Sequence, residues 1–169
     1  MNSRLEEVLV TEYKTGMIAF LQAHPECFRE ALDLAVSDRQ PWAWRAAWLL
    51  WSCMEENDTR LRDHVHSIIS SFHGKGDGHL RELIKILYLM ELDEEAEGLL
   101  FDHCVGIWEA VGKRPSVRYN ALRMIVKIVK RHPDLQREIG FLTRDHYLET
   151  LSPGIKRAVP ELIKGSLPA

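Results

Sequence analysis

A row of basic side chains is the feature of this sequence best suited to bind a charged ligand. Its members share one face of a predicted helix, at the spacing i, i+4, i+7 and i+8, and are Arg123, Lys127, Lys130 and Arg131. Arg118 lies nearby in the same segment. Such a face can hold phosphate groups by charge alone. An ordinary solvent-facing side of a helix would show the same spacing, so both interpretations stay open.

Tryptophan is concentrated in one short segment, because four of the five tryptophans fall between residues 41 and 51. Trp44, Trp48 and Trp51 share one face of a predicted helix whose other faces are also largely apolar. A helix that is apolar nearly all round is usually buried, so we expect these indoles in the core. The alternative is an aromatic platform for a base or a peptide. Trp42, at the start of the helix, is then expected to be the most exposed.

No group of residues has the spacing of a catalytic or metal site. His64 and His66 point about 200° apart on a helix and cannot chelate one ion. Asp145 and His146 are neighbours that do not face one another. The glycine-rich loop at residues 74–78 lacks the spacing of a phosphate-binding loop. We therefore expect no catalytic residue, no metal ion and no cofactor.

The composition is that of a folded globular chain, with 169 residues, 46% hydrophobic and 28% charged. The net charge of −3 is distributed unevenly. Residues 1–111 hold 20 acidic and 10 basic side chains, whereas residues 112–169 hold 5 and 12. This asymmetry favours an anionic ligand at one end, or head-to-tail self-association. With charges near its start, three distant cysteines and no long apolar stretch, the chain is expected to be cytoplasmic, without a membrane partner.

Hydrophobic spacing predicts helices through nearly the whole chain. One apolar face, for example, runs from Leu5 through Tyr13 to Leu21. No stretch alternates between apolar and polar residues, so we expect no strand. A basic residue recurs near the start of alternate helices, at positions 45, 81, 118 and 156, in steps of 36, 37 and 38. A period near 37 built from two helices indicates an α-solenoid.

The residues at these positions carry a resemblance to a known family. Each basic residue follows an apolar one and precedes a second apolar residue, as in Leu80-Arg81-Glu82-Leu83. With helix pairs of this length, the pattern resembles HEAT-like repeat proteins. The resemblance implies an all-α fold, a right-handed α-α superhelix of about four HEAT-like hairpins plus a C-terminal helix. It implies a single domain over residues 1–169, with repeats at about 3–40, 41–77, 78–114 and 115–152 and a final helix at 153–166.

The resemblance also implies a function, a non-enzymatic module that binds a protein or peptide partner. DNA alkylation glycosylases are also built from HEAT-like repeats, which makes nucleic-acid binding the alternative, although the net negative charge disfavours it. The chain further resembles small bacterial HEAT-like proteins, some of them labelled adenylosuccinate lyase. A lyase of that type has a Ser-Ser-x-Met-Pro loop and a far longer chain, and neither is present here. The residues expected to bind are Arg118, Arg123, Lys127, Lys130, Arg131 and Trp42.

Overall fold

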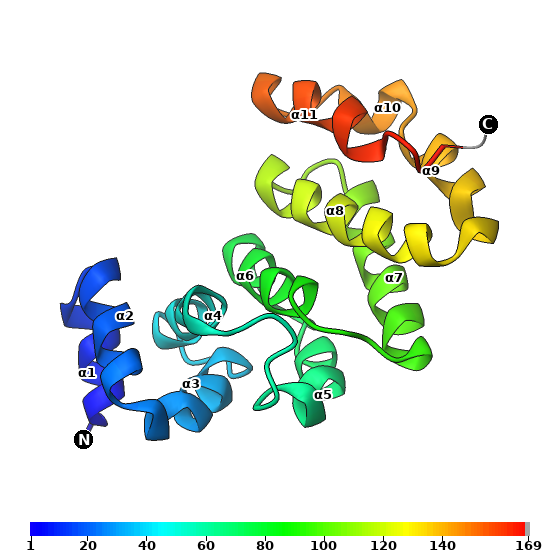
Figure 1. Cartoon of the computed structure of the whole chain (residues 1–169). Helices are drawn as coiled ribbons and strands as arrows, with labels where there is room; N and C mark the ends of the chain where they lie inside the picture. Colours follow the sequence, from blue (N-terminus) through cyan, green and yellow to red (C-terminus); the bar gives the residue numbers. More distant parts are fainter. Residues whose placement is uncertain (168–169) are drawn as a thin grey trace. The chain divides into compact units, whose positions relative to one another are not determined.

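The computed structural model describes residues 1–167, and every regular element within that range is a helix (Figure 1). The chain forms two compact units, Met1–Leu92 (unit 1) and the part that begins at Asp93 (unit 2). The helices of unit 1 are α1 (Arg4–Thr11), α2 (Lys14–Ala23), α3 (Phe28–Ala35), α4 (Trp42–Cys53), α5 (Val65–Ser70) and α6 (Asp77–Tyr88). Those of unit 2 are α7 (Glu94–Glu109), α8 (Pro115–Arg131), α9 (Gln136–Leu142), α10 (Asp145–Leu148) and α11 (Pro153–Ile163). The predicted all-α class is confirmed.

Helix α4 is the centre of unit 1, where it packs against α3 and α6 and also contacts α1 and α2. Its buried stripe has the helical spacing i, i+3, i+4, i+7 and consists of Ala43, Ala46, Ala47 and Leu50. Alanine side chains are short, so the neighbouring helices can approach α4 closely without leaving voids.

The predicted burial of the tryptophans on α4 is wrong. Trp44 is 38% exposed, and Trp42, Trp48 and Trp51 are only half-buried. Two apolar stripes share this helix, and the stripe of small residues faces the core because indoles there would hold the neighbouring helices apart. The tryptophan that is fully buried is Trp108, on α7 of unit 2.

The first predicted helix is interrupted at Glu12 and Tyr13, which separate α1 from α2. In a continuous helix the amide of Tyr13 would bond to the carbonyl of Leu9. Here Arg45 donates a hydrogen bond from Nη1 to that carbonyl at 2.7 Å. A cation at the C-terminal end of a helix also interacts favourably with the helix dipole. The guanidinium therefore takes the place of a backbone donor, and Tyr13 is left 89% exposed.

Unit 2 is built on the two longest helices, α7 and α8, which pack along one another. Helix α7 begins at an N-cap, because the Asp93 carboxylate accepts a hydrogen bond from the amide of Ala96 at 2.7 Å. Helix α8 begins at Pro115, where a proline needs no hydrogen-bond partner. One face of α8 is apolar at helical spacing and packs in the core, since Val117, Ala121, Met124, Ile125 and Ile128 are all buried.

Candidate functional site

A pocket opens on unit 1 where the chain is interrupted between α1 and α2. Its volume is about 180 Å³, and α4 forms the opposite wall. The lining is largely apolar and includes Tyr13, Met17, Trp44 and Trp48. Tyr13 and Trp44 are the most exposed of these side chains. Exposed aromatic residues around an apolar hollow are typical anchors for a ligand or a partner protein, so this is the strongest candidate site.

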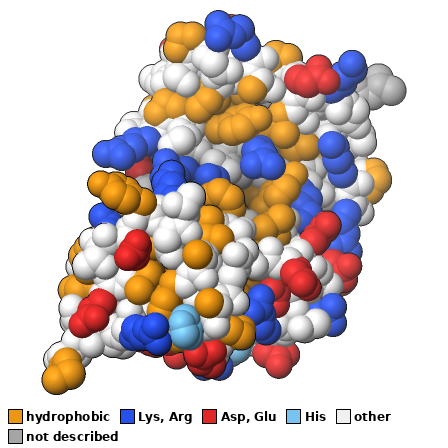
Figure 2. Space-filling view, turned by 60° about the vertical axis from the view of Figure 1, so that its left-hand side comes forward, with side chains coloured by type: hydrophobic (Ala, Val, Ile, Leu, Met, Phe, Trp, Pro, Cys, Tyr) orange, Lys and Arg blue, Asp and Glu red, His pale blue; other side chains and the backbone are white. Residues whose placement is uncertain are grey.

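Two cations lie over the indoles of this pocket. Lys14 Nζ is 5.2 Å from the centroid of the Trp48 ring, and the guanidinium carbon of Arg45 is 5.5 Å from that of Trp44. Each such contact stabilises the ring position by about 0.5–1 kcal/mol at an exposed site. The buried Nε of Arg45 has no hydrogen-bond partner within residues 1–167. The pocket thus joins apolar surface to positive charge. On the face of the molecule shown in Figure 2, hydrophobic, basic and acidic side chains are interspersed.

The row of indoles continues along α4 to Trp51. Its indole N–H donates to the carboxylate of Glu82, and Lys85 Nζ lies 4.6 Å from the centroid of its ring. Glu82 is 1% exposed and also accepts a hydrogen bond from Arg81 at 2.8 Å. A buried carboxylate is tolerated only when it is paired and hydrogen-bonded. Trp51 is therefore held in place as a link between α4 and α6.

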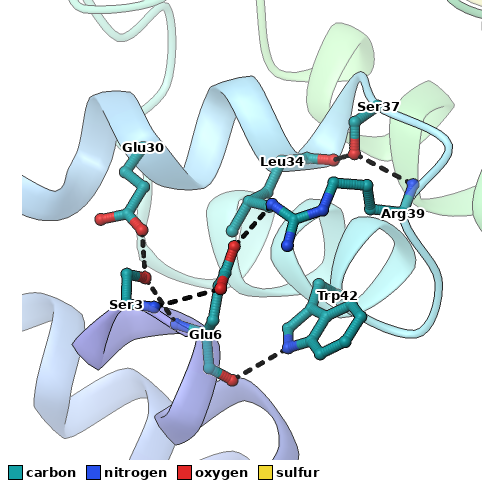
Figure 3. Close-up of polar contacts among 7 residues, drawn as sticks. All are labelled: Ser3, Glu6, Glu30, Leu34, Ser37, Arg39 and Trp42. Carbon is teal, nitrogen blue, oxygen red and sulfur yellow. Dashed lines mark hydrogen bonds and ion pairs between the residues drawn. The ribbon is translucent and has the colours of Figure 1, made fainter. Parts of the chain in front are cut away.

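Trp42 is also a structural link, and the expectation that it would be the most exposed tryptophan is wrong. Its indole N–H donates to the backbone carbonyl of Glu6 at 3.1 Å, and Arg39 lies over its ring (Figure 3). Arg39 also pairs with the Glu6 carboxylate at 2.6 Å. That hydrogen bond, together with one from the Ser3 amide, lowers the pKa of Glu6. These contacts join α1 to the start of α4, and Trp44 is the exposed tryptophan instead.

Arg118 is not available at the surface, as a binding residue would have to be, because its side chain is 0% exposed. Its guanidinium donates to the carbonyls of Trp108 at 2.8 Å and Tyr147 at 2.6 Å, and to the Thr150 hydroxyl at 3.1 Å. It also stacks on the Trp108 ring, 4.6 Å from the centroid. Burial lowers the pKa of Arg118. Its donors are directed at the protein's own backbone in the interior of unit 2.

The other predicted basic residues lie along α8. Arg123 and Lys127 are half-buried, whereas Lys130 and Arg131 are exposed. Arg131 Nη1 lies 3.5 Å from the carboxylate of Glu97, a side chain that is itself buried. Part of the positive charge is therefore balanced within the protein, and a role of these four residues in binding stays a prediction.

The described residues offer little that could perform covalent chemistry. Burial raises the pKa of all three thiols, Cys27, Cys53 and Cys104, which disfavours the nucleophilic thiolate. No group of three or more His, Cys, Asp or Glu within residues 1–167 is arranged to hold a metal ion. Over the same range, no helix combines the length and the apolar character needed to cross a bilayer.

Sequence reasoning missed the pocket because it treated residues 5–21 as one helical face. Tyr13 and Met17 then belonged to one apolar core stripe, and only the interruption turns Tyr13 outward. The sequence of α4, which forms the opposite wall of the pocket, did contain a pattern that could have indicated the site. Ala43 and its neighbours at i+3, i+4 and i+7 form a complete stripe of their own, which leaves Trp44 on a different face.

A family model described as a HEAT repeat domain matches residues 1–166. No curated protein and no solved structure matches the chain.

Proposed function

The chain belongs to the HEAT repeat domain family, and on that premise we propose that it is a non-catalytic module that binds a protein or peptide partner. HEAT repeats commonly act as protein-interaction scaffolds, because stacked hairpins present long surfaces of side chains. The observation that carries the proposal for this chain is the pocket of unit 1 with its exposed Tyr13 and Trp44.

The pocket favours a partner that inserts one large apolar side chain. Tyr13 and Trp44 supply flat apolar surface at the rim, and Met17 supplies an adaptable side chain within the lining. Burying a Leu- or Phe-sized side chain contributes roughly 1.5–3 kcal/mol. Tyrosine and tryptophan are the residues that most often dominate binding energy at interfaces.

The charges at the pocket favour an acidic neighbour of that apolar side chain. Lys14 and Arg45 line the pocket together with one acid, Glu12. A carboxylate placed beside the apolar anchor would gain from both cations. We therefore propose a segment with a large apolar residue next to Asp or Glu as the partner motif.

Selection from a displayed random-peptide library against the full chain tests this proposal. We expect enriched peptides that carry an apolar anchor beside an acid. Their affinity should fall by roughly 30-fold or more in a Tyr13→Ser/Trp44→Ser variant, the loss typical of two interface anchors. The matched control is Phe141→Ser in unit 2, which removes another exposed aromatic side chain (52% exposed) and should leave binding unchanged.

Several results would contradict the proposal. Selection without a shared motif, or equal binding to the double variant, would remove the pocket as the binding site. Stronger binding of single-stranded oligonucleotides than of peptides would favour the nucleic-acid alternative. Release of fumarate from adenylosuccinate by the purified protein would favour the lyase alternative.

A further inference from the structure

Unit 2 carries a second hollow, which is larger than the pocket of unit 1 and differs from it in charge. It is a groove of about 410 Å³ along α7, bordered by the C-terminal part of α8 and the following turn. Its apolar lining consists of Leu99, Phe101, Ile128 and Leu135. Leu99 is 44% exposed although it lies in the middle of a helix. The volume falls within the range of roughly 300–1,000 Å³ that is typical of ligand-binding clefts.

The rim of the groove is acidic. Glu94, Glu95 and Asp102 line it and are exposed to solvent. Residues 93–112 hold six acidic side chains and no Lys or Arg. Buried Glu97 is the exception, because its carboxylate is paired with Arg131 and with His132, the latter at 3.3 Å. The uncompensated negative charge therefore lies at the exposed rim.

Gly98 provides an observation that is independent of charge. It lines the groove, lies inside α7 and is exposed. A Cβ added there would meet no heavy atom within 4 Å, so nothing in the fold requires a glycine. Glycine is nevertheless the least favourable residue inside a helix except proline. A backbone without a side chain at this point lets another chain approach α7 closely.

We propose that this groove binds a basic amphipathic helical segment of a partner protein. The apolar face of the segment would lie on Leu99 and its neighbours, near Gly98, and its Lys or Arg residues would reach Glu94, Glu95 and Asp102. A helix is favoured over an extended peptide because the described residues present no strand edge to which a strand could add. This surface is distinct from the pocket of unit 1, and its expected partner has the opposite charge.

The probe is a synthetic helix of about 14 residues, four turns, with leucine on one face and lysine on the other. Its binding to the full chain is measured by fluorescence anisotropy. We expect binding that weakens between about 50 and 300 mM salt, and none by the same peptide with glutamate in place of lysine. Glu94→Gln/Glu95→Gln should weaken it by roughly fivefold. The control Glu149→Gln/Glu161→Gln removes two other exposed acids and should change affinity by less than about twofold.

Substitutions of glycine separate binding from stability. Gly98→Ala should raise the midpoint of thermal unfolding and still weaken the peptide, and Gly98→Leu should weaken it further. The control is Gly106→Ala, at another exposed position of α7 with open space around it, outside the groove lining. It should raise the midpoint without any effect on binding.

Three outcomes would overturn the inference. The first is unchanged affinity in both Gly98→Leu and Glu94→Gln/Glu95→Gln. The second is an equal loss in the control pair of acids, which would show attraction by overall charge only. The third is concentration-dependent self-association in ultracentrifugation that Gly98→Leu abolishes, which would make a second copy of the chain the occupant.

Discussion

Replacing Arg118 by methionine should destabilise unit 2 more than any other exchange of a basic residue on α8. Methionine fills a similar length of apolar space but donates no hydrogen bond. The change leaves the carbonyls of Trp108 and Tyr147 without the donors that now lie 2.8 and 2.6 Å away. It also removes the cation that stacks on the Trp108 ring.

The size of the effect follows from these contacts. A hydrogen bond to a charged group is worth about 1.5–3 kcal/mol, and a desolvated cation–π contact adds about 2 kcal/mol. The gain is offset in part because a buried guanidinium has lost its hydration. We expect a net loss of about 3 kcal/mol in the free energy of unfolding, a large share of the roughly 5–15 kcal/mol that stabilises a typical domain.

Urea unfolding followed by circular dichroism measures this loss. With a slope of about 1–3 kcal/mol per molar urea, the midpoint should fall by roughly 1–3 M. Lys130→Met is the matched control, because Lys130 is exposed on the same helix, and it should cost less than about 0.5 kcal/mol. A loss below about 1 kcal/mol in Arg118→Met would refute the reasoning. It would also return Arg118 to consideration as a binding residue.

Three further outcomes follow from other contacts. The Arg60 guanidinium lowers the pKa of Asp58 to about 2. The ion pair therefore stabilises the fold above about pH 4, and this stabilisation is lost as the pH falls toward 2. In Asp58→Asn, the difference in the free energy of unfolding between urea melts at pH 7 and pH 3 should be smaller by about 1 kcal/mol. Burial lowers the pKa of His79, whose Nε2 lies 2.7 Å from the carbonyl of Ala35. Because the unfolded chain then binds the proton more readily, the free energy of unfolding should fall as the pH drops below about 6.5. In His79→Gln this fall should be smaller. Asp93→Ala removes the N-cap of α7 and should cost about 1 kcal/mol in the same melts.

The all-α class could be predicted from the sequence because it depends on local hydrophobic spacing. The apolar face of α8 has the helical period, and an aspartate directly before a helix is a common N-cap, so both features depend on local sequence alone. The orientation of α4 could not be predicted in this way. Both its alanine stripe and its indole stripe satisfy the helical period, and the choice depends on how closely α3 and α6 approach. Spacing reports that a face is apolar, and packing decides which apolar face is buried.

The candidate site was harder to predict because it depends on contacts between distant residues. The break at Tyr13 exists together with a side-chain donor, Arg45, that comes from another helix. The burial of Arg118 likewise depends on carbonyls at the ends of α7 and α10. Helical spacing does not reveal contacts between distant residues, so the sequence indicated that Arg118 is basic without showing what it contacts.

The hydrogen bonds that Trp42 and Arg45 make to α1 have a consequence for altering the length of the chain. Both span the same separation, since Trp42 reaches Glu6 and Arg45 reaches Leu9, each 36 residues earlier. These two hydrogen bonds therefore fix how α4 is positioned against α1. Inserting or deleting a single residue in α3 would turn the start of the following segment by about 100° about the helix axis. The side chains of Trp42 and Arg45 would then no longer reach the carbonyls of Glu6 and Leu9. If a whole hairpin is exchanged, the two hydrogen bonds to α1 are preserved only when the replacement has the same length.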